Sequence, residues 1–277
     1  MSAYTLVPLT SEERIRSYLQ TDVNYAAYAL GDLDPPYAQF ASWLGAVQGS
    51  EIDGLALHYR GLDPPVLFLM GSKAAIMALL GHGISGPCVY YTAKPEAEPL
   101  LAIYYHLHEV HRMFRMRVQS ATFRPSHEAA RLPIPLDEGH AAPIMSLQRD
   151  ASQTDGREWH DIAFAPHMLK DGYYYGIFDQ GQLIAMAGTH VVAKRSRMAA
   201  VGNVVVHPKA RGKGYGKAVS QAVTAALLAD GYELIVLNVR QDNPSAIRIY
   251  EQIGYYHTGE FIEGLAESRP DMGRCIG

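Results

Sequence analysis

The sequence predicts an α/β fold made of two similar halves, and three patterns support this. Short apolar runs typical of strands alternate with segments whose apolar residues recur every three to four positions, as in helices. The order strand, strand, strand, helix, strand, helix, strand occurs on each side of residues 131–143. That segment holds three prolines, interrupts the periodicity and is typical of a linker. We therefore expect a first domain at 1–130 and a second at 144–277.

The second half carries clear element signals. Two strand-like runs flank the sequence QGQ, which indicates a hairpin turn. One predicted helix stops at Gly231; another opens with Asn243 as N-cap and Pro244 in its first turn, and closes at Gly254. The predicted strands are 173–179, 183–193, 198–206, 233–239 and 255–261, and the predicted helices are 216–231 and 243–254.

The first half repeats this order more loosely. Its predicted strands are 43–49, 55–59, 65–71, 87–93 and 113–118, and its predicted helices are 72–81 and 95–107. The strand–helix junction here reads LFLMGSKAA and has no cluster of glycines and cations. We expect that this half has lost any ligand site that the second half carries at its corresponding junction.

Composition limits the classes of function. A formal charge of −4 over 277 residues disfavours a nucleic-acid-binding protein, so an anion site must be local. Two cysteines are too few for a disulfide framework, and we expect a cytoplasmic protein with no signal peptide and no membrane span. The sequence HLHEVHR at 106–112 lacks the spacing of a zinc protease motif, so no metal is expected.

The most informative segment is HPKARGKGYGKA, residues 207–218, between a predicted strand and a helix. A nucleotide P-loop fails here, because Arg211 stands where the first glycine is required and Ala218 where Ser or Thr is required. A dinucleotide fingerprint fails at Lys217, the place of its last glycine. The pattern R-x-x-G-x-G is satisfied by Arg211, Gly214 and Gly216.

This arrangement suits a pyrophosphate. The first free N–H groups of a helix point outward with the positive end of its dipole, and glycines let the backbone close around phosphate oxygens. Arg211, Lys213 and Lys217 add charged contacts at the rim. A solvated basic turn is the structural alternative.

Here the sequence resembles the GNAT superfamily of acyl-CoA-dependent N-acyltransferases. VVVHPKARGKGYGKAV resembles the acetyl-CoA pyrophosphate motif of that family, and VLNVRQDNPSAIRIYEQIGY resembles its following strand-and-helix motif. The resemblance covers about 140–265 and implies a mixed, mostly antiparallel sheet flanked by helices. The first half resembles the degenerate partner domain of tandem GNAT proteins, which implies two tandem copies.

The resemblance also implies a role for individual residues toward acetyl-CoA. The strand before the loop would pair its backbone with the pantetheine arm, and the loop would hold the pyrophosphate. A splay between this strand and the next, which ends in Leu237, Asn238 and Val239, would make room for the cofactor. The implied cofactor-binding residues are Val204, Val205, Val206, Arg211, Gly212, Lys213, Gly214, Tyr215, Gly216, Lys217, Asn238, Asn243 and Tyr250.

N-acylation requires a held amine, a donor to the developing oxyanion and a proton for the departing thiolate. The backbone N–H of Val204 or Val205 is expected to serve the oxyanion. Tyr250 matches the family tyrosine that lies near the thioester sulfur, and we expect it to act as general acid. Its structural alternative is a core tyrosine on the inner face of the helix.

The general base is open. Many members of the family carry a glutamate on the strand before the loop, but this chain reads AAVGNVVVHP there. Asn203 occupies that stretch and is predicted to orient water or substrate. His207 and His190 are titratable candidates, although a structural role suits His207 at the end of a strand.

Several questions stay open at this point. The acceptor is expected to be an amine of a small molecule or peptide, and the oligomeric state is undetermined, with a homodimer as one arrangement. A non-catalytic acyl-CoA-binding sensor is the alternative function, favoured by the missing glutamate. Asp32 and Asp34, in a proline turn, suggest either capping or an acidic wall that attracts an amine substrate or seals the two halves. Trp159, Phe164 and His167 suggest either an acceptor pocket or ordinary packing.

Overall fold

The computed structural model describes residues 4–83, 86–126, 132–155 and 164–269, and its contacts divide the chain into two compact units. The first unit contains Met1–Arg115, Arg240–Asp242 and Thr258–Gly277. The second contains Met116–Val239 and Asn243–His257. Each unit is described by itself.

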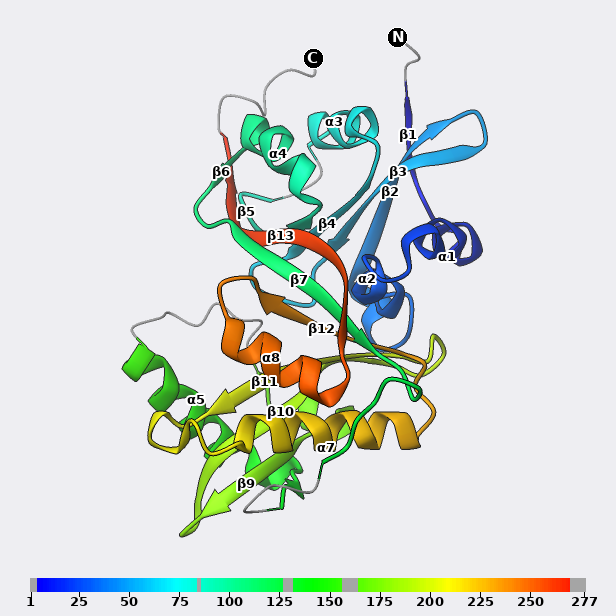
Figure 1. The fold of residues 1–277 in the computed structure, drawn as a ribbon. Helices are drawn as coiled ribbons and strands as arrows, with labels where there is room; N and C mark the ends of the chain where they lie inside the picture. Colours follow the sequence, from blue (N-terminus) through cyan, green and yellow to red (C-terminus); the bar gives the residue numbers. More distant parts are fainter. Residues whose placement is uncertain (1–3, 84–85, 127–131, 156–163, 270–277) are drawn as a thin grey trace. The chain divides into compact units, whose positions relative to one another are not determined.

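The sheet of the first unit contains the strands in the order β1-β2-β3-β4-β5-β13, with β6 beside β13 (Figure 1). All of its pairs are antiparallel except β4 and β5, which align Val66 with Tyr90 in parallel. The strands are β1 (Thr5–Pro8), β2 (Ala41–Gln48), β3 (Glu51–Tyr59), β4 (Val66–Gly71), β5 (Cys88–Ala93), β6 (Tyr105–Leu107) and β13 (Tyr256–Ser268). The helices are α1 (Glu12–Leu19), α2 (Ala27–Gly31), α3 (Lys73–Gly81) and α4 (Glu98–Tyr104). Strand β7 (His111–Val118) follows α4 in the chain and runs from the first unit into the second.

The sheet of the second unit contains the strands in the order β12-β11-β10-β9-β8. Again one pair is parallel, β11 with β12, and the others are antiparallel. The strands are β8 (Ile134–Pro135), β9 (Tyr175–Asp179), β10 (Gln182–Ala193), β11 (Met198–Val206) and β12 (Leu234–Arg240). The helices are α5 (Ala141–Asp155), α6 (Met168–Asp171), α7 (Tyr215–Ala229) and α8 (Pro244–Ile253).

The two units share one topology. In each, four antiparallel strands, β1–β4 or β8–β11, lead into a helix, α3 or α7, that crosses to a parallel fifth strand, β5 or β12. A crossover helix is the connection that parallel neighbours require. The predicted fold class, a mixed and mostly antiparallel sheet flanked by helices, is confirmed.

Helices cover both faces of the sheet in the second unit (Figure 1). Residues of α5 and α6 form one buried cluster with Val205 of β11. The neighbouring Val206 faces α7, because a Cβ on Gly216 would lie 3.4 Å from its Cγ2. Since successive side chains of a strand point to opposite faces, α5 and α7 lie on opposite sides of β11.

Three predicted elements differ clearly from the structure. The helix predicted at 95–107 ends at Tyr104, because Tyr105–Leu107 form β6 and pair with the end of β13. The segment 131–143, predicted as a linker, contributes β8, which pairs with β9 by aligning Ile134 with Gly176. The strand predicted at 255–261 extends to Ser268, and from Thr258 it belongs to the first unit, where it pairs with β5. The ranges 1–130 and 144–277 stay a prediction of the domain limits, whereas contacts alone divide the chain near residue 116.

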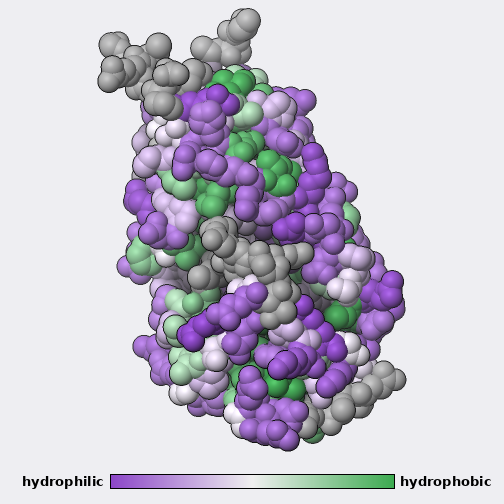
Figure 2. Space-filling view, turned by 90° about the vertical axis from the view of Figure 1, so that its left-hand side faces the viewer, coloured by the Kyte–Doolittle hydropathy of each residue, from purple (hydrophilic) through white to green (hydrophobic). Residues whose placement is uncertain are grey.

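In the part of the chain that the structure describes, no helix is both long enough and apolar enough to cross a membrane. The face drawn in Figure 2 is mainly hydrophilic, with small scattered groups of hydrophobic residues.

Candidate functional site

The loop between β11 and α7 is held open by two glycines. Gly212 and Gly214 have φ of +77° and +78°, and an added Cβ at either would meet no described atom within 4 Å. The left-handed region disfavours residues with a side chain, so here the glycines are required by conformation rather than by crowding. The exposed loop therefore presents its backbone to open space.

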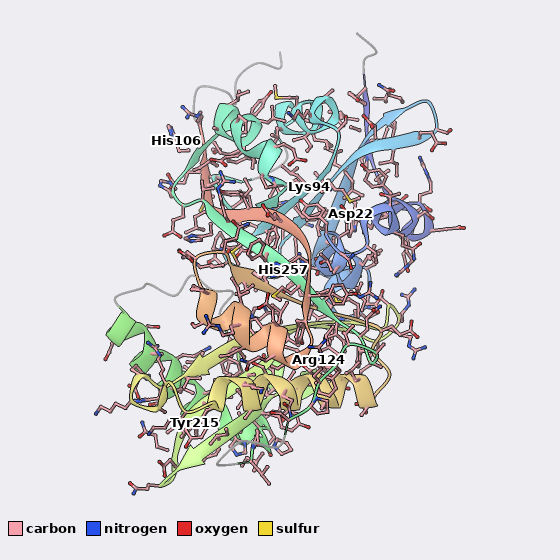
Figure 3. The ribbon with its side chains drawn as sticks, viewed as in Figure 1. Asp22, Lys94, His106, Arg124, Tyr215 and His257 are labelled. Atoms are coloured by element: carbon pink, nitrogen blue, oxygen red, sulfur yellow. The ribbon has the colours of Figure 1, made fainter. Side chains whose placement is uncertain are left out.

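Helix α7 begins at this loop without a side-chain cap. Gly214 is its N-cap residue and, because it has no side chain, gives no side-chain cap to the first turn. Uncapped amides at a helix start carry the positive end of the dipole and favour an anion. Tyr215 stands at this start (Figure 3), but its side chain is buried, so it offers its backbone rather than its ring.

Charged groups surround the loop unevenly. Lys213 is exposed, and Lys217 is half-buried in the first turn of α7. Arg211 is turned back, and its Nε donates to the carbonyl of Val206 at 3.4 Å. Arg211 therefore braces the end of β11 in this structure.

Strands β11 and β12 separate next to the loop. Their parallel pairing runs from Met198 with Leu234 to Val201 with Leu237 and goes no further, although β11 continues to Val206 and β12 to Arg240. The predicted splay is present at the expected place. Backbone groups beyond the last pair are thereby released from this ladder.

Helix α8 completes this region. A Cβ on Gly216 would lie 3.4 Å from Val206 Cγ2 and 3.8 Å from Ile249 Cδ1. The loop, the end of β11 and α8 therefore meet at Gly216. This brings most of the residues predicted for the cofactor into one neighbourhood.

Two asparagines of that set have different surroundings. Asn238, on β12 just past the last pair, has a buried Oδ1 with no hydrogen-bond partner among the described residues. Such an atom is costly unless a donor reaches it. Asn243 is the N-cap of α8, and its Oδ1 accepts from the N–H of Ala246 at 3.2 Å and from Ser245 Oγ at 2.9 Å. Asn243 thus performs the predicted capping role.

Tyr250 lies on the inner side of α8, 7% exposed. Its ring contacts that of Tyr255 edge to face, with centroids 5.9 Å apart, and Tyr255 Oη bonds Thr224 Oγ1 at 2.8 Å. Burial raises the pKa of Tyr255 well above its usual range. Tyr250 is therefore both packed in the core and placed on the helix that borders the loop.

Asn203 is held in an unusual conformation. It is 4% exposed and has φ of +51°. Its N–H donates to His190 Nε2 at 3.2 Å, and its Nδ2 donates to Tyr174 Oη at 3.2 Å. The side chain predicted to orient water or substrate is thus engaged by the protein itself. Sequence reasoning missed Tyr174 here.

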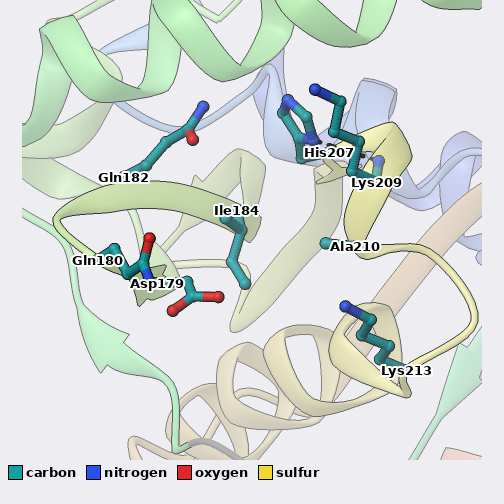
Figure 4. Close-up of a pocket in the computed structure, with 8 residues that line it drawn as sticks. All are labelled: Asp179, Gln180, Gln182, Ile184, His207, Lys209, Ala210 and Lys213. Atoms are coloured by element: carbon teal, nitrogen blue, oxygen red, sulfur yellow. Dashed lines mark hydrogen bonds between the residues drawn. The ribbon is translucent and has the colours of Figure 1, made fainter.

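His207, the other candidate base, serves the loop. Its Nδ1 accepts from the N–H of Lys209 at 3.3 Å, which caps a short 3-10 helix, Pro208–Ala210. It also lines an open depression of about 240 Å³ next to the loop (Figure 4). The lining comes from β9, β10, their turn and the loop: Asp179, Gln180, Gln182, Ile184, His207, Lys209, Ala210 and Lys213. Of the predicted cofactor residues, only Lys213 takes part.

The corresponding junction in the first unit is closed. Ser72 caps α3 by accepting from the N–H of Ala75 at 3.2 Å, and its hydroxyl donates to Asp53 at 2.7 Å. Tyr4 also donates to Asp53, and the hydrogen bonds from Ser72 and Tyr4 lower the pKa of that carboxyl. A carboxylate therefore stands beside the start of α3, and the loss of a ligand site in this unit stays a prediction.

Other residues singled out in the sequence lie elsewhere. Asp34 is 1% exposed and pairs with Arg16 at 3.5 Å, so it does not form an acidic wall. Phe164 is buried against Tyr174, with ring centroids 5.8 Å apart, while His167 is exposed. Trp159 lies outside the described residues. Among those that are described, no group of three or more His, Cys, Asp or Glu side chains could hold a metal ion.

Comparison with known proteins gives a consistent answer. Residues 141–255 match the acetyltransferase (GNAT) family. The mycothiol acetyltransferase of Renibacterium salmoninarum is 29% identical over 156 residues, 45% of this chain and 46% of that protein. That of Paenarthrobacter aurescens is 25% identical over 196 residues, 63% of this chain and 58% of that protein. The chain thus spans about half the length of the curated relatives it matches.

Solved structures share the fold over most of the chain. A putative acetyltransferase of the GNAT family from Novosphingobium aromaticivorans has a TM-score of 0.59 at 19% identity, over 90% of this chain and 99% of that one. A tandem GNAT protein from the clavulanic acid biosynthesis pathway has a TM-score of 0.57 at 15% identity, over 96% and 99%. At these identities the likeness concerns the fold.

Proposed function

Because residues 141–255 match the acetyltransferase (GNAT) family, we propose that the second unit binds acetyl-CoA and transfers its acetyl group to an amine of a small molecule or peptide. The observation that carries this proposal is the open glycine loop, which starts α7 beside the point where β11 and β12 stop pairing. The orphaned Oδ1 of Asn238 adds a buried acceptor at the same opening.

The residues present fit the cofactor. The amides from Gly212 to Lys217 would bind the pyrophosphate, with Lys213 and Lys217 adding charge. The exposed edge of β11 from Val204 to Val206 would bind the pantetheine arm as an added strand would. Asn238 would accept from an amide N–H of that arm. Acetyl-CoA would supply the activated acyl group as a thioester.

The chemistry assigned to the protein is modest. Binding both reactants in line lowers the entropic part of the barrier by up to about 7–11 kcal/mol in ideal cases. A backbone N–H of Val204 or Val205 would donate to the oxyanion, since Asn203 and Val204 have no aligned partner on β10 and Val205 is the first residue that pairs again, with Met186. Tyr250 would donate its proton to the departing sulfur.

No carboxylate on β11 is available as a base, because the strand reads MAAVGNVVV. Asn203 has no basic group and His190 already accepts from the N–H of Asn203. We therefore propose that the amine loses its proton to ordered water. A protein of this kind would prefer acceptors that reach it partly deprotonated.

Two measurements test the function. Isothermal titration with acetyl-CoA should give saturable binding, and absence of binding, where a known acyltransferase binds, would remove the proposal. Release of free thiol across a panel of amines, including the acceptor of mycothiol acetyltransferase, then distinguishes an enzyme from a sensor. Binding without turnover on any amine would favour the non-catalytic acyl-CoA sensor.

A further inference from the structure

Strands β10 and β11 carry two irregularities that cancel each other. Between the pairs Thr189–Val201 and Val191–Ala200, β10 has one extra residue, His190. Between the pairs Gly188–Gly202 and Met186–Val205, the extra residue is on β11, where Asn203 and Val204 face one residue of β10. The first bulge shifts the register by one and the second restores it.

The two bulges are joined by a direct hydrogen bond. His190 Nε2 accepts from the backbone N–H of Asn203 at 3.2 Å. The imidazole lies flat against Gly202, where an added Cβ would stand 2.2 Å from its Cε1. Only a residue without a side chain at 202 allows this approach, so the ring and the glycine form a matched pair.

The bonded residue needs such support. Asn203 has φ of +51°, a region that a residue with a side chain adopts at a cost, although asparagine tolerates it better than most. Its Nδ2 is bonded to Tyr174 Oη, and that hydroxyl donates to the carbonyl of Thr189 at 2.8 Å. The backbone of Asn203 is thus held by His190 of β10, and its side chain is held by Tyr174, which precedes β9.

We propose that His190 is a positioning residue for acyl transfer. By accepting the N–H of Asn203, its imidazole sets the direction of the next amides, those of Val204 and Val205, which are assigned to the acyl carbonyl. This inference rests on the proposed function. In this role His190 does not act as the base, because its Nε2 already accepts the N–H of Asn203.

The acetyl carbonyl itself provides the test, and no acceptor needs to be known. A hydrogen bond to the thioester carbonyl polarises it and moves its ¹³C resonance downfield. We expect a downfield shift for acetyl-CoA labelled at the carbonyl when it binds the wild-type protein. His190→Leu should lose this shift and still bind acetyl-CoA, because the loop amides are unchanged. His190→Gln, which retains an acceptor, should keep most of it.

The controls separate the possible outcomes. His106→Leu should retain the shift, since that exposed side chain lies on β6 of the first unit. If His190→Leu does not fold, as judged by circular dichroism, His190→Ser replaces it with a smaller side chain. An unchanged shift in the folded variant, or no shift in the wild type, overturns the role of His190. Absence of acetyl-CoA binding by the wild type refutes the proposed function instead.

Discussion

Val201 and Leu237 form the last aligned pair of β11 and β12, two residues before the left-handed Asn203. Beyond this pair the strands separate, while the glycine loop follows at the end of β11. Because β11 and β12 stop pairing beside the start of α7, backbone donors and acceptors are exposed in one place. The proposed cofactor site depends on this relationship more than on any single side chain.

Gly212 should be sensitive to alanine because of its backbone conformation. Gly212→Ala strains a residue at φ +77° and should cost about 1–2 kcal/mol of stability. If the loop relaxes, its amides turn, and acetyl-CoA should bind about tenfold more weakly, equivalent to ~1.4 kcal/mol. Titration calorimetry measures the affinity.

Gly83→Ala is the matched control, because Gly83 has the same φ of +77° and open space but belongs to the first unit. It should lose similar stability and keep its affinity. Equal affinity for both variants and the wild type would contradict the role of the loop.

Tyr250 should matter for turnover rather than for binding. Tyr250→Phe removes the proton donor, and loss of general acid catalysis should lower kcat about 100-fold or more. The affinity for acetyl-CoA should change little. The measurement is steady-state thiol release with the acceptor found in the amine panel.

Tyr255→Phe is the control for packing. It removes a hydroxyl bonded to Thr224, next to the ring of Tyr250, and should cost about 1 kcal/mol of stability with unchanged kcat. A similar fall in kcat for both variants would show that disturbed packing, not acid catalysis, is responsible.

The first unit should not bind acetyl-CoA. Ser72 caps α3 and Asp53 stands beside it, so an added anion would meet a carboxylate. Calorimetry should therefore give one site per chain. Ser72→Ala should lose about 1 kcal/mol of stability, as removal of an N-cap does, and leave acetyl-CoA affinity unchanged. Two equivalent sites would refute this assignment.

Asp32 predicts a pH dependence of stability in the first unit. Burial raises the pKa of Asp32 from 3.8 to about 8, so the folded chain holds a proton that the unfolded chain releases. This contribution is fully present below about pH 4 and is lost as pH rises through about 8. Urea unfolding across this range should show the decline, and Asp32→Asn should flatten it; an unchanged profile would exclude Asp32 as its source.

Local features of the chain were readable from the sequence because local interactions encode them. The strand predicted at 198–206 coincides with β11, and α8 has the expected caps, with Asn243 at its start and Gly254 at φ +106° at its end. The R-x-x-G-x-G pattern likewise marked a loop that needs left-handed backbone. Helix α1 was not predicted, although its sequence has the signals of a helix start: an N-cap, Ser11, and two acidic residues in the first turn.

The sequence by itself determined the main alternation of strands and helices in each half, the caps of α8 and the glycine loop, because periodicity and caps act between residues close in the chain. Only the tertiary structure decided that β13 pairs with β5, aligning Ile262 with Ala93, and that His190 bonds the amide of Asn203. The edge of a strand can pair with any strand of suitable register, so its own sequence does not name its partner. The position of a bulge likewise depends on the strand that lies opposite. Both are settled by contacts between residues distant in sequence, which no local pattern records.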